Sequence, residues 1–164
     1  MTVFCKKKEK SGKFFGEPTE NAIIQAGVDN SIYKTELQKQ FPRIAEIPFE
    51  SSRKLMTTIH KTESGYRIIT KGAPDVLLKK CNKDYNNGNV TSMSGYRIEQ
   101  IKKVNQTMAE RALRVLAVAY SDVPKISNGD AGAGAVSANV EDNLIFVRIN
   151  WNDRSTQRRS KRSC

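Results

Sequence analysis

Thiol and imidazole groups are the side chains of this sequence that could bind a metal or act as nucleophiles. The sequence has Cys5, Cys81 and Cys164, at wide spacing and without a CxxC pair, and a single histidine, His60. A structural zinc site needs several such ligands at short spacing, and a cysteine nucleophile needs a neighbouring base. We therefore expect no metal site, a structural His60, a buried Cys81 thiol and reduced cysteines.

The second chemistry that the composition suggests is binding to a polyanion. Lys and Arg number 28 against 17 Asp and Glu, which gives a formal charge of +11. Residues 1–13 carry +4 and residues 148–164 carry +5, so that only +2 remains for the sequence between them. Charge confined to two ends is typical of solvated tails rather than of a binding face. A basic nucleic-acid-binding protein is therefore an alternative, but not the preferred interpretation.

Four short segments contain, between them, glycine, aromatic, cationic and carboxylate residues. Any one of these segments alone would be weak evidence for a function. In chain order they are Gly16–Glu20 (GEPTE), Ile47–Phe49 (IPF) followed by Arg53–Lys54, Lys71–Asp75 (KGAPD), and Arg111–Tyr120 (RALRVLAVAY). Together they resemble the nucleotide-binding domain of P-type cation-transporting ATPases, most closely that of calcium pumps. The resemblance implies ATP as the ligand, with Mg²⁺ carried by the nucleotide.

The resemblance implies that two segments bind the adenine base. Phe49 corresponds to the ring that stacks on adenine, a contact worth about 1–3 kcal/mol per base in general. Glu20 corresponds to the carboxylate that meets the amino edge of adenine, and Thr19 is its neighbour on the pocket wall. Without the family context, Phe49 reads as a core residue of a strand, Thr19 as a helix cap and Glu20 as a first-turn carboxylate.

The resemblance also implies which cations lie beside the nucleotide. Lys71 corresponds to the lysine next to the ligand, and Gly72 permits a close approach of backbone. Lys54 and Arg114 resemble the two cations that face the phosphates. Taken alone, these cations read as solvated charges. Ser51 stands where the calcium-pump pattern often has an arginine, which leaves one phosphate contact unassigned.

The motifs that perform catalysis in this family do not occur in the sequence, which has neither a DKTGTLT loop nor a TGE loop. We therefore expect the chain to bind ATP without hydrolysing it. Its partners would be the phosphorylation, actuator and membrane domains of an intact pump, on the cytoplasmic side of the membrane. No apolar run approaches the roughly 20 residues of a membrane span, so we expect a soluble chain without direct membrane contact. Calcium as the transported ion rests on the likeness alone.

Capping residues and apolar periodicity predict four helices that must position these segments. They are expected over residues 19–27, 31–41, 74–81 and 94–112. Thr19 is expected to cap the first helix and Gly27 to end it. Asn30 or Ser31 would cap the second, which ends before Pro42. The apolar face of the fourth helix would consist of Ile98, Ile101, Val104 and Met108.

Alternating and apolar runs predict five strands in the body of the chain. They are expected over residues 43–49, 54–61, 66–71, 114–120 and 143–147, with residues 62–65 forming a hairpin. Residues 82–91 and 127–138 are expected to be loops. The order of elements predicts an α+β fold, in which helices pack on one face of a mainly antiparallel sheet.

The predicted organisation is a connector over residues 1–13, a nucleotide-binding domain over 14–147 and a disordered basic tail over 148–164. A coding sequence can be chosen for residues 147–157 that, read one base later, spells the family's usual continuation. Our hypothesis is therefore that residues 147–164 arise from a reading-frame slip. The region before Gly16 is also shorter than is usual in the family, so a non-functional remnant is a further alternative.

Overall fold

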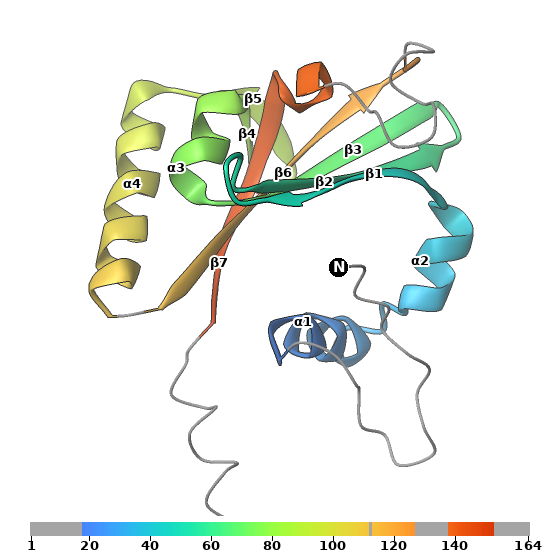
Figure 1. The fold of residues 1–164 in the computed structure, drawn as a ribbon, viewed down its shortest axis with the longest axis horizontal. Helices are drawn as coiled ribbons and strands as arrows, with labels where there is room; N and C mark the ends of the chain where they lie inside the picture. The colour runs from blue at the N-terminus through green and yellow to red at the C-terminus, as the bar shows by residue number, and fades with distance from the viewer. Residues whose placement is uncertain (1–17, 112, 127–137, 153–164) are drawn as a thin grey trace, which may run out of the picture. The chain divides into compact units, whose positions relative to one another are not determined.

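The computed structural model describes residues 18–111, 113–126 and 138–152, and these divide between two units, residues 1–42 and 43–164 (Figure 1). In the first unit, the described part consists of helix α1 (Pro18–Asp29) and helix α2 (Lys34–Gln40). The connector predicted over residues 1–13 lies outside the described residues. In the described ranges, no helix is both long and apolar enough to cross a bilayer.

The ends of α1 differ from the sequence prediction at both sides. Helix α1 begins at Pro18, so Thr19 lies within the first turn instead of capping it. Proline suits a first helical position because its missing N–H would have no partner there. At the other end the helix passes through Gly27 and stops where Ser31 adopts a φ of +60°. The Ile32 N–H then donates to the Gly27 carbonyl at 2.8 Å, which satisfies an end-of-helix acceptor.

The use of Ser31 to end α1 also explains why the cap predicted for α2 is wrong. The N-cap of α2 is Tyr33, which makes no side-chain capping hydrogen bond. The predicted end of this helix before Pro42 is confirmed, since α2 stops at Gln40.

The second unit is built on a seven-stranded sheet with the order β1-β2-β3-β6-β7-β4-β5. The strands are β1 (Arg43–Glu50), β2 (Leu55–Thr62), β3 (Gly65–Gly72), β4 (Cys81–Asn86), β5 (Asn89–Ser92), β6 (Arg114–Val123) and β7 (Leu144–Asn152). All neighbouring strands pair antiparallel except β4 and β7, which are parallel. The mainly antiparallel α+β fold predicted from the sequence is confirmed.

Helices cover one face of this sheet. Helix α3 (Pro74–Leu77) continues into the 3-10 turn η1 (Leu78–Lys80), and helix α4 (Gly95–Glu110) lies beside α3 on the same face (Figure 1). The side chains between these helices and the sheet form the main core: Leu55, Leu77, Leu78, Ile101, Ala117, Ala119, Leu144, Phe146 and Ile149. A second 3-10 turn, η2 (Ala138–Glu141), precedes β7.

The first three strands agree with the sequence prediction to within one residue at each end. Their alternation is also as expected, because Leu55, Thr57 and Ile59 are buried while Met56 and the residues that alternate with it are half-buried. The hairpin between β2 and β3 closes with Thr62 opposite Gly65. One face of these strands is therefore the core face, and the other carries no core.

The loop predicted over residues 82–91 is instead the hairpin of β4 and β5. Asn87 and Gly88 form its turn with φ values of +48° and +88°. An Asn-Gly pair with positive φ at both positions is the strongest short-range signal for a two-residue hairpin turn. Tyr85 and Val90 face each other across this hairpin. The polar composition of the segment obscured a turn signal that the sequence does contain.

Helix α4 begins as predicted, with Ser94 as its N-cap, whose hydroxyl oxygen accepts a hydrogen bond from the Arg97 N–H at 3.2 Å. On its predicted apolar face, Ile101 is buried and Met108 packs against the core. Val104 is 45% exposed, however, so this part of the prediction is wrong. The core contact of α4 is narrower than its apolar periodicity suggested.

Strand β7 is longer than predicted, because it continues beyond Val147 to Asn152. Its register pairs Arg148 with Val118 and Ile149 with Ala117. Ile149 is only 8% exposed and belongs to the core. Residues 148–152, which we assigned to the basic tail, are therefore part of the sheet, and residues 153–164 lie outside the described residues.

This extension predicts a large loss of stability for one substitution in β7 and almost none for the adjacent one. Ile149→Ala should lower the free energy of unfolding by about 2–5 kcal/mol, because it removes a buried side chain from the core. Arg148→Ala should change it by less than about 0.5 kcal/mol, because Arg148 is exposed. Urea denaturation of both variants measures the difference. Equal stabilities would contradict the placement of Ile149 in the core.

Candidate functional site

Three strands bring four of the candidate residues to one end of the sheet. Phe49 lies near the end of β1, Lys54 lies in the turn before β2, and Lys71 and Gly72 end β3. The register places Leu55, which follows Lys54, directly opposite Gly72. Neighbouring strands are ~4.8 Å apart, so these segments span about two strand spacings. Residues far apart in the sequence therefore converge here.

At Gly72, the β1–β2 turn lies in close contact with β3. A Cβ atom on Gly72 would lie 2.2 Å from the Lys54 carbonyl oxygen and 2.7 Å from Cδ2 of Leu55. The same carbonyl oxygen accepts a hydrogen bond from the Ala73 N–H at 3.1 Å. The close backbone approach expected at Gly72 therefore involves the chain's own turn.

Lys54 is held in an unusual backbone conformation in this turn. Its φ is +56°, in the left-handed region, which costs a residue other than glycine roughly 1–2 kcal/mol. Its N–H donates to the Glu50 carbonyl at 2.6 Å, which closes the turn. The Lys54 side chain is exposed. The fold therefore holds the backbone of this cation while leaving its ammonium group accessible to solvent.

Lys71 belongs to the sheet face opposite the core. Its neighbours Thr70 and Gly72 are both buried on the helix-covered face, and successive residues of a strand point to opposite faces. Across the sheet, Lys71 pairs with Met56 on β2 and with Val118 on β6, both half-buried. The second face of the sheet thus carries the half-buried Lys71 between two apolar residues of the neighbouring strands.

Phe49 is an exposed aromatic residue, with 60% of its surface accessible. It lies where the register of β1 against β2 shifts, between Ile47 and Glu50. The alternative interpretation of Phe49 as a core residue of a strand is therefore wrong. Its ring is accessible to a flat ligand.

The remaining candidates are described only at the level of the backbone. Arg114 is the first residue of β6, and because Gly72 pairs with Ala117, Arg114 lies at the same end of the sheet. Thr19 and Glu20 lie in the first turn of α1, in the other unit. The arrangement at this end of the sheet therefore includes Phe49, Lys54, Lys71, Gly72 and Arg114.

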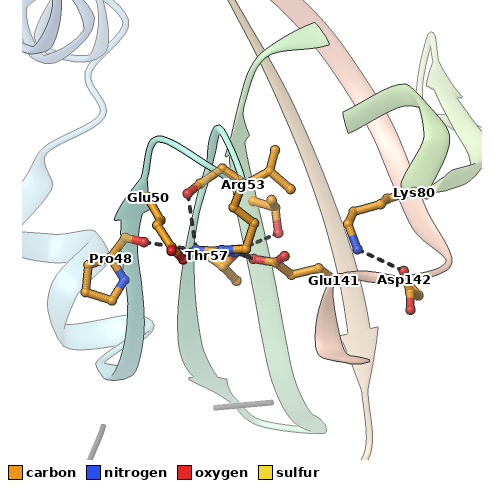
Figure 2. Close-up of polar contacts among 9 residues, drawn as sticks. Pro48, Glu50, Arg53, Thr57, Lys80, Glu141 and Asp142 are labelled. Carbon is orange, nitrogen blue, oxygen red and sulfur yellow. Dashed lines mark hydrogen bonds and ion pairs between the residues drawn. The ribbon is translucent and has the colours of Figure 1, made fainter. Parts of the chain in front are cut away.

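Two residues that the sequence reasoning did not assign to the site lie beside it. Arg53 precedes Lys54 and forms an ion pair with Glu141 of η2, which is completely buried (Figure 2). The next residue, Asp142, accepts a hydrogen bond from Nζ of Lys80 at 3.1 Å. The motif contained Arg53, but a fully buried glutamate has no signature in a single sequence.

The structure gives no support for metal or thiol chemistry in the described residues, where no cluster of three or more potential ligands occurs. Cys81 is half-buried, and its Sγ donates to the Leu77 carbonyl at 3.2 Å. Burial, together with the nearby charge of Asp84, raises the pKa of the Cys81 thiol to about 12. It is therefore protonated at neutral pH and a poor nucleophile, as expected. His60 lies 3.0 Å from the Thr58 hydroxyl.

Comparison with known proteins identifies the family to which this sheet and its exposed residues belong. Residues 1–149 match the family described as P-type ATPase, cytoplasmic domain N. The chain belongs to this family. The resemblance found from the four sequence segments is thereby confirmed, and the alternative of a nucleic-acid-binding protein is not favoured.

Relatives of this N domain are calcium-transporting ATPases from bacteria and plants. The chain is 37% identical over 126 residues to a calcium-transporting ATPase of Listeria monocytogenes, and this alignment covers 76% of this chain and 14% of that protein. It is 39% identical over 123 residues to calcium-transporting ATPase 1 of Lactococcus lactis, and this alignment covers 74% of this chain and 14% of that protein. It is 33% identical over 132 residues to a putative plasma membrane-type calcium-transporting ATPase of Arabidopsis thaliana, and this alignment covers 77% of this chain and 13% of that protein. The chain thus spans about one seventh of the length of these relatives.

The contact at Gly72 predicts that this N domain does not tolerate a methyl group there. Gly72→Ala should lower the free energy of unfolding by about 1–3 kcal/mol, because the new Cβ would overlap the Lys54 carbonyl. Gly95→Ala is the matched control, since a Cβ on Gly95 meets nothing within 4 Å. Thermal denaturation of both variants measures the effect. Equal melting temperatures would contradict the close contact.

Proposed function

We propose that this chain binds ATP at the sheet end that carries Phe49, Lys54 and Lys71. The observation that carries the proposal is the 60% exposure of Phe49, near the turn that carries Lys54 and the strand end that carries Lys71. An exposed aromatic ring offers a stacking surface for a purine. The adjacent ammonium groups offer charge to phosphate oxygens. The aromatic ring thus suits the base of a nucleotide, and the two ammonium groups suit its phosphates.

The roles of the individual residues follow from their positions. Phe49 would stack on adenine, and Lys71, between Met56 and Val118, would lie next to the nucleotide. Lys54 and Arg114 would face the phosphates. Lys54 and Lys71 come from β-turn and strand positions whose backbone is fixed by the contact at Gly72. The protein then loses little backbone entropy on binding, because the groups are already in place.

Thr19 and Glu20 form a further part of the proposal, which rests on the sequence resemblance alone. Glu20 would accept a hydrogen bond from the adenine amino group, and Thr19 would lie next to it on the pocket wall. Both residues belong to the segment GEPTE, which is one of the four that matched the family pattern.

The wider role that we propose is positioning rather than chemistry. In an intact pump, this domain would present the γ-phosphate, with its Mg²⁺, to an aspartate of a separate phosphorylation domain. Actuator and membrane domains would complete the pump, with this domain on the cytoplasmic side and calcium as the transported ion. The family description and the names of the relatives support this assignment.

The affinity should be modest, since one stacking contact and exposed phosphate contacts must offset the cost of association. We expect a Kd between sub-millimolar and millimolar, which corresponds to roughly −4 to −5 kcal/mol. Because a ligand that binds only the folded state raises its stability, ATP should also raise the melting temperature. A remnant without a competent site would show no such increase.

Removing the aromatic ring tests the proposal directly. Phe49→Ala should weaken ATP binding about tenfold, a loss of about 1.4 kcal/mol, because the stacking surface disappears. Lys71→Ala should also weaken it. Tyr96→Ala is the control, because Tyr96 is a 76% exposed aromatic residue on α4, remote in the sequence from the sheet end. Calorimetric titration measures the Kd, and wild-type affinity in both site variants would remove the assignment.

A further inference from the structure

Arg53 connects three segments that are separate in the sequence. Its Nη2 donates to the Pro48 carbonyl of β1 at 2.9 Å and to the Leu55 carbonyl of β2 at 3.2 Å. Its Nη1 donates to Oε1 of Glu141 in η2 (Figure 2). One guanidinium group therefore ties together both strands that flank the β1–β2 turn and a third segment from a distant part of the chain.

The partner of Arg53 is fixed in its own right. Glu141 is 0% exposed, and its Oε1 also accepts a hydrogen bond from the Thr57 hydroxyl at 2.5 Å. Thr57 in turn lies 2.9 Å from the hydroxyl oxygen of Thr70 on β3. The other carboxylate oxygen, Oε2, has no hydrogen-bond partner among the described residues. A buried carboxylate with so few partners depends strongly on its cation, so Glu141 holds Arg53 in one orientation.

The contacts of Arg53 fall on the backbone next to the residues proposed to bind ATP. Pro48, whose carbonyl Arg53 holds, directly precedes Phe49, and Arg53 itself directly precedes Lys54. Fixing the Pro48 carbonyl and the turn therefore limits the positions available to the Phe49 ring and to the Lys54 side chain.

The charge of Arg53 is already neutralised by the protein. Besides Glu141, the Glu50 carboxylate lies 3.8 Å from Nε of Arg53. Thr57, which donates to the Glu141 carboxylate, and its neighbour Thr70 are buried on the helix-covered face, whereas Lys71 belongs to the opposite face. Arg53 therefore directs its charge away from the face that carries Lys71, and it differs in this respect from the exposed Lys54.

We propose that Arg53, held by buried Glu141, is a positioning residue of the nucleotide site. It fixes the turn that carries Phe49 and Lys54 and does not itself touch the phosphates. This inference rests on the proposed function. Within the IPF…RK motif, Arg53 then holds the site in shape, and Lys54 is the cation that contacts the ligand.

Titration of the full chain with ATP and with adenosine distinguishes positioning from phosphate contact. If Arg53 positions the Phe49 ring, Arg53→Ala should weaken the binding of adenosine on the order of tenfold. It should weaken the binding of ATP at least as much, because the same turn carries Lys54. In a Phe49→Ala background, the effect of Arg53→Ala on ATP affinity should shrink, because the ring it positions is absent. A general loss of stability would not produce this dependence on Phe49.

Arg67→Ala provides the matched control. Arg67 forms an equally extensive ion pair, with Nε and Nη2 donating to the two oxygens of Asp122 at 2.7 and 2.8 Å, at the opposite end of β3. Its removal should leave both affinities unchanged. Glu141→Gln keeps the shape of its side chain but removes the charge, and should weaken both ligands in the same direction as Arg53→Ala. If Arg53→Ala does not fold, the Glu141→Gln titrations decide the question.

The possible outcomes separate the inference from the function on which it rests. Losses for both adenosine and ATP, absent in Arg67→Ala, support positioning by Arg53. A loss for ATP alone would show that Arg53 does not position the Phe49 ring and would overturn the inference, and so would unchanged affinities in a folded variant. A wild-type chain that binds neither ligand would instead overturn the proposed function.

Discussion

The contact between the β1–β2 turn and the end of β3 is the constraint on which the candidate site depends. Gly72 has no side chain, so the Lys54 carbonyl can lie against it and accept a hydrogen bond from Ala73. This contact joins the IPF…RK and KGAP segments, whose side chains are otherwise separated by a full strand. A larger residue would force the turn away, and the aromatic and cationic groups would lose their common location.

The two faces of the sheet perform different tasks at this end. The helix-covered face holds the core together with Thr57, Thr70 and Glu141, and it anchors the turn through Arg53. The opposite face presents Lys71 between Met56 and Val118. A buried carboxylate on one side and a half-buried cation on the other are compatible because alternate residues of one strand point to opposite faces. Anchoring groups and ligand groups can thus come from consecutive residues.

Much of the fold, and the family, could be predicted from the sequence. Most of the wrong predictions concern features that depend on tertiary contacts. The hairpin of β2 and β3 and the cap of α4 depend on local signals and were predicted correctly. The β4–β5 hairpin was missed although Asn87-Gly88 encodes it, because the polar surroundings suggested a loop. The length of β7 and the burial of Glu141 depend on partners distant in the sequence, Ala117 and Arg53, and no local pattern reports them. For Phe49, only the structure distinguishes an exposed ring from a core residue.

The place of β7 in the sheet has a consequence for how this chain acquires its structure. β7 is the last described strand, yet it lies in the interior of the sheet, between β6 and the parallel strand β4. During synthesis, a four-stranded piece and the small β4–β5 ribbon would emerge first, each with an unsatisfied edge. Only the arrival of β7 joins them, through pairings that close long loops and form slowly. Until then the edges of β6 and β4 are open to pairing with another polypeptide, so completion of the sheet is also the step that covers these two edges.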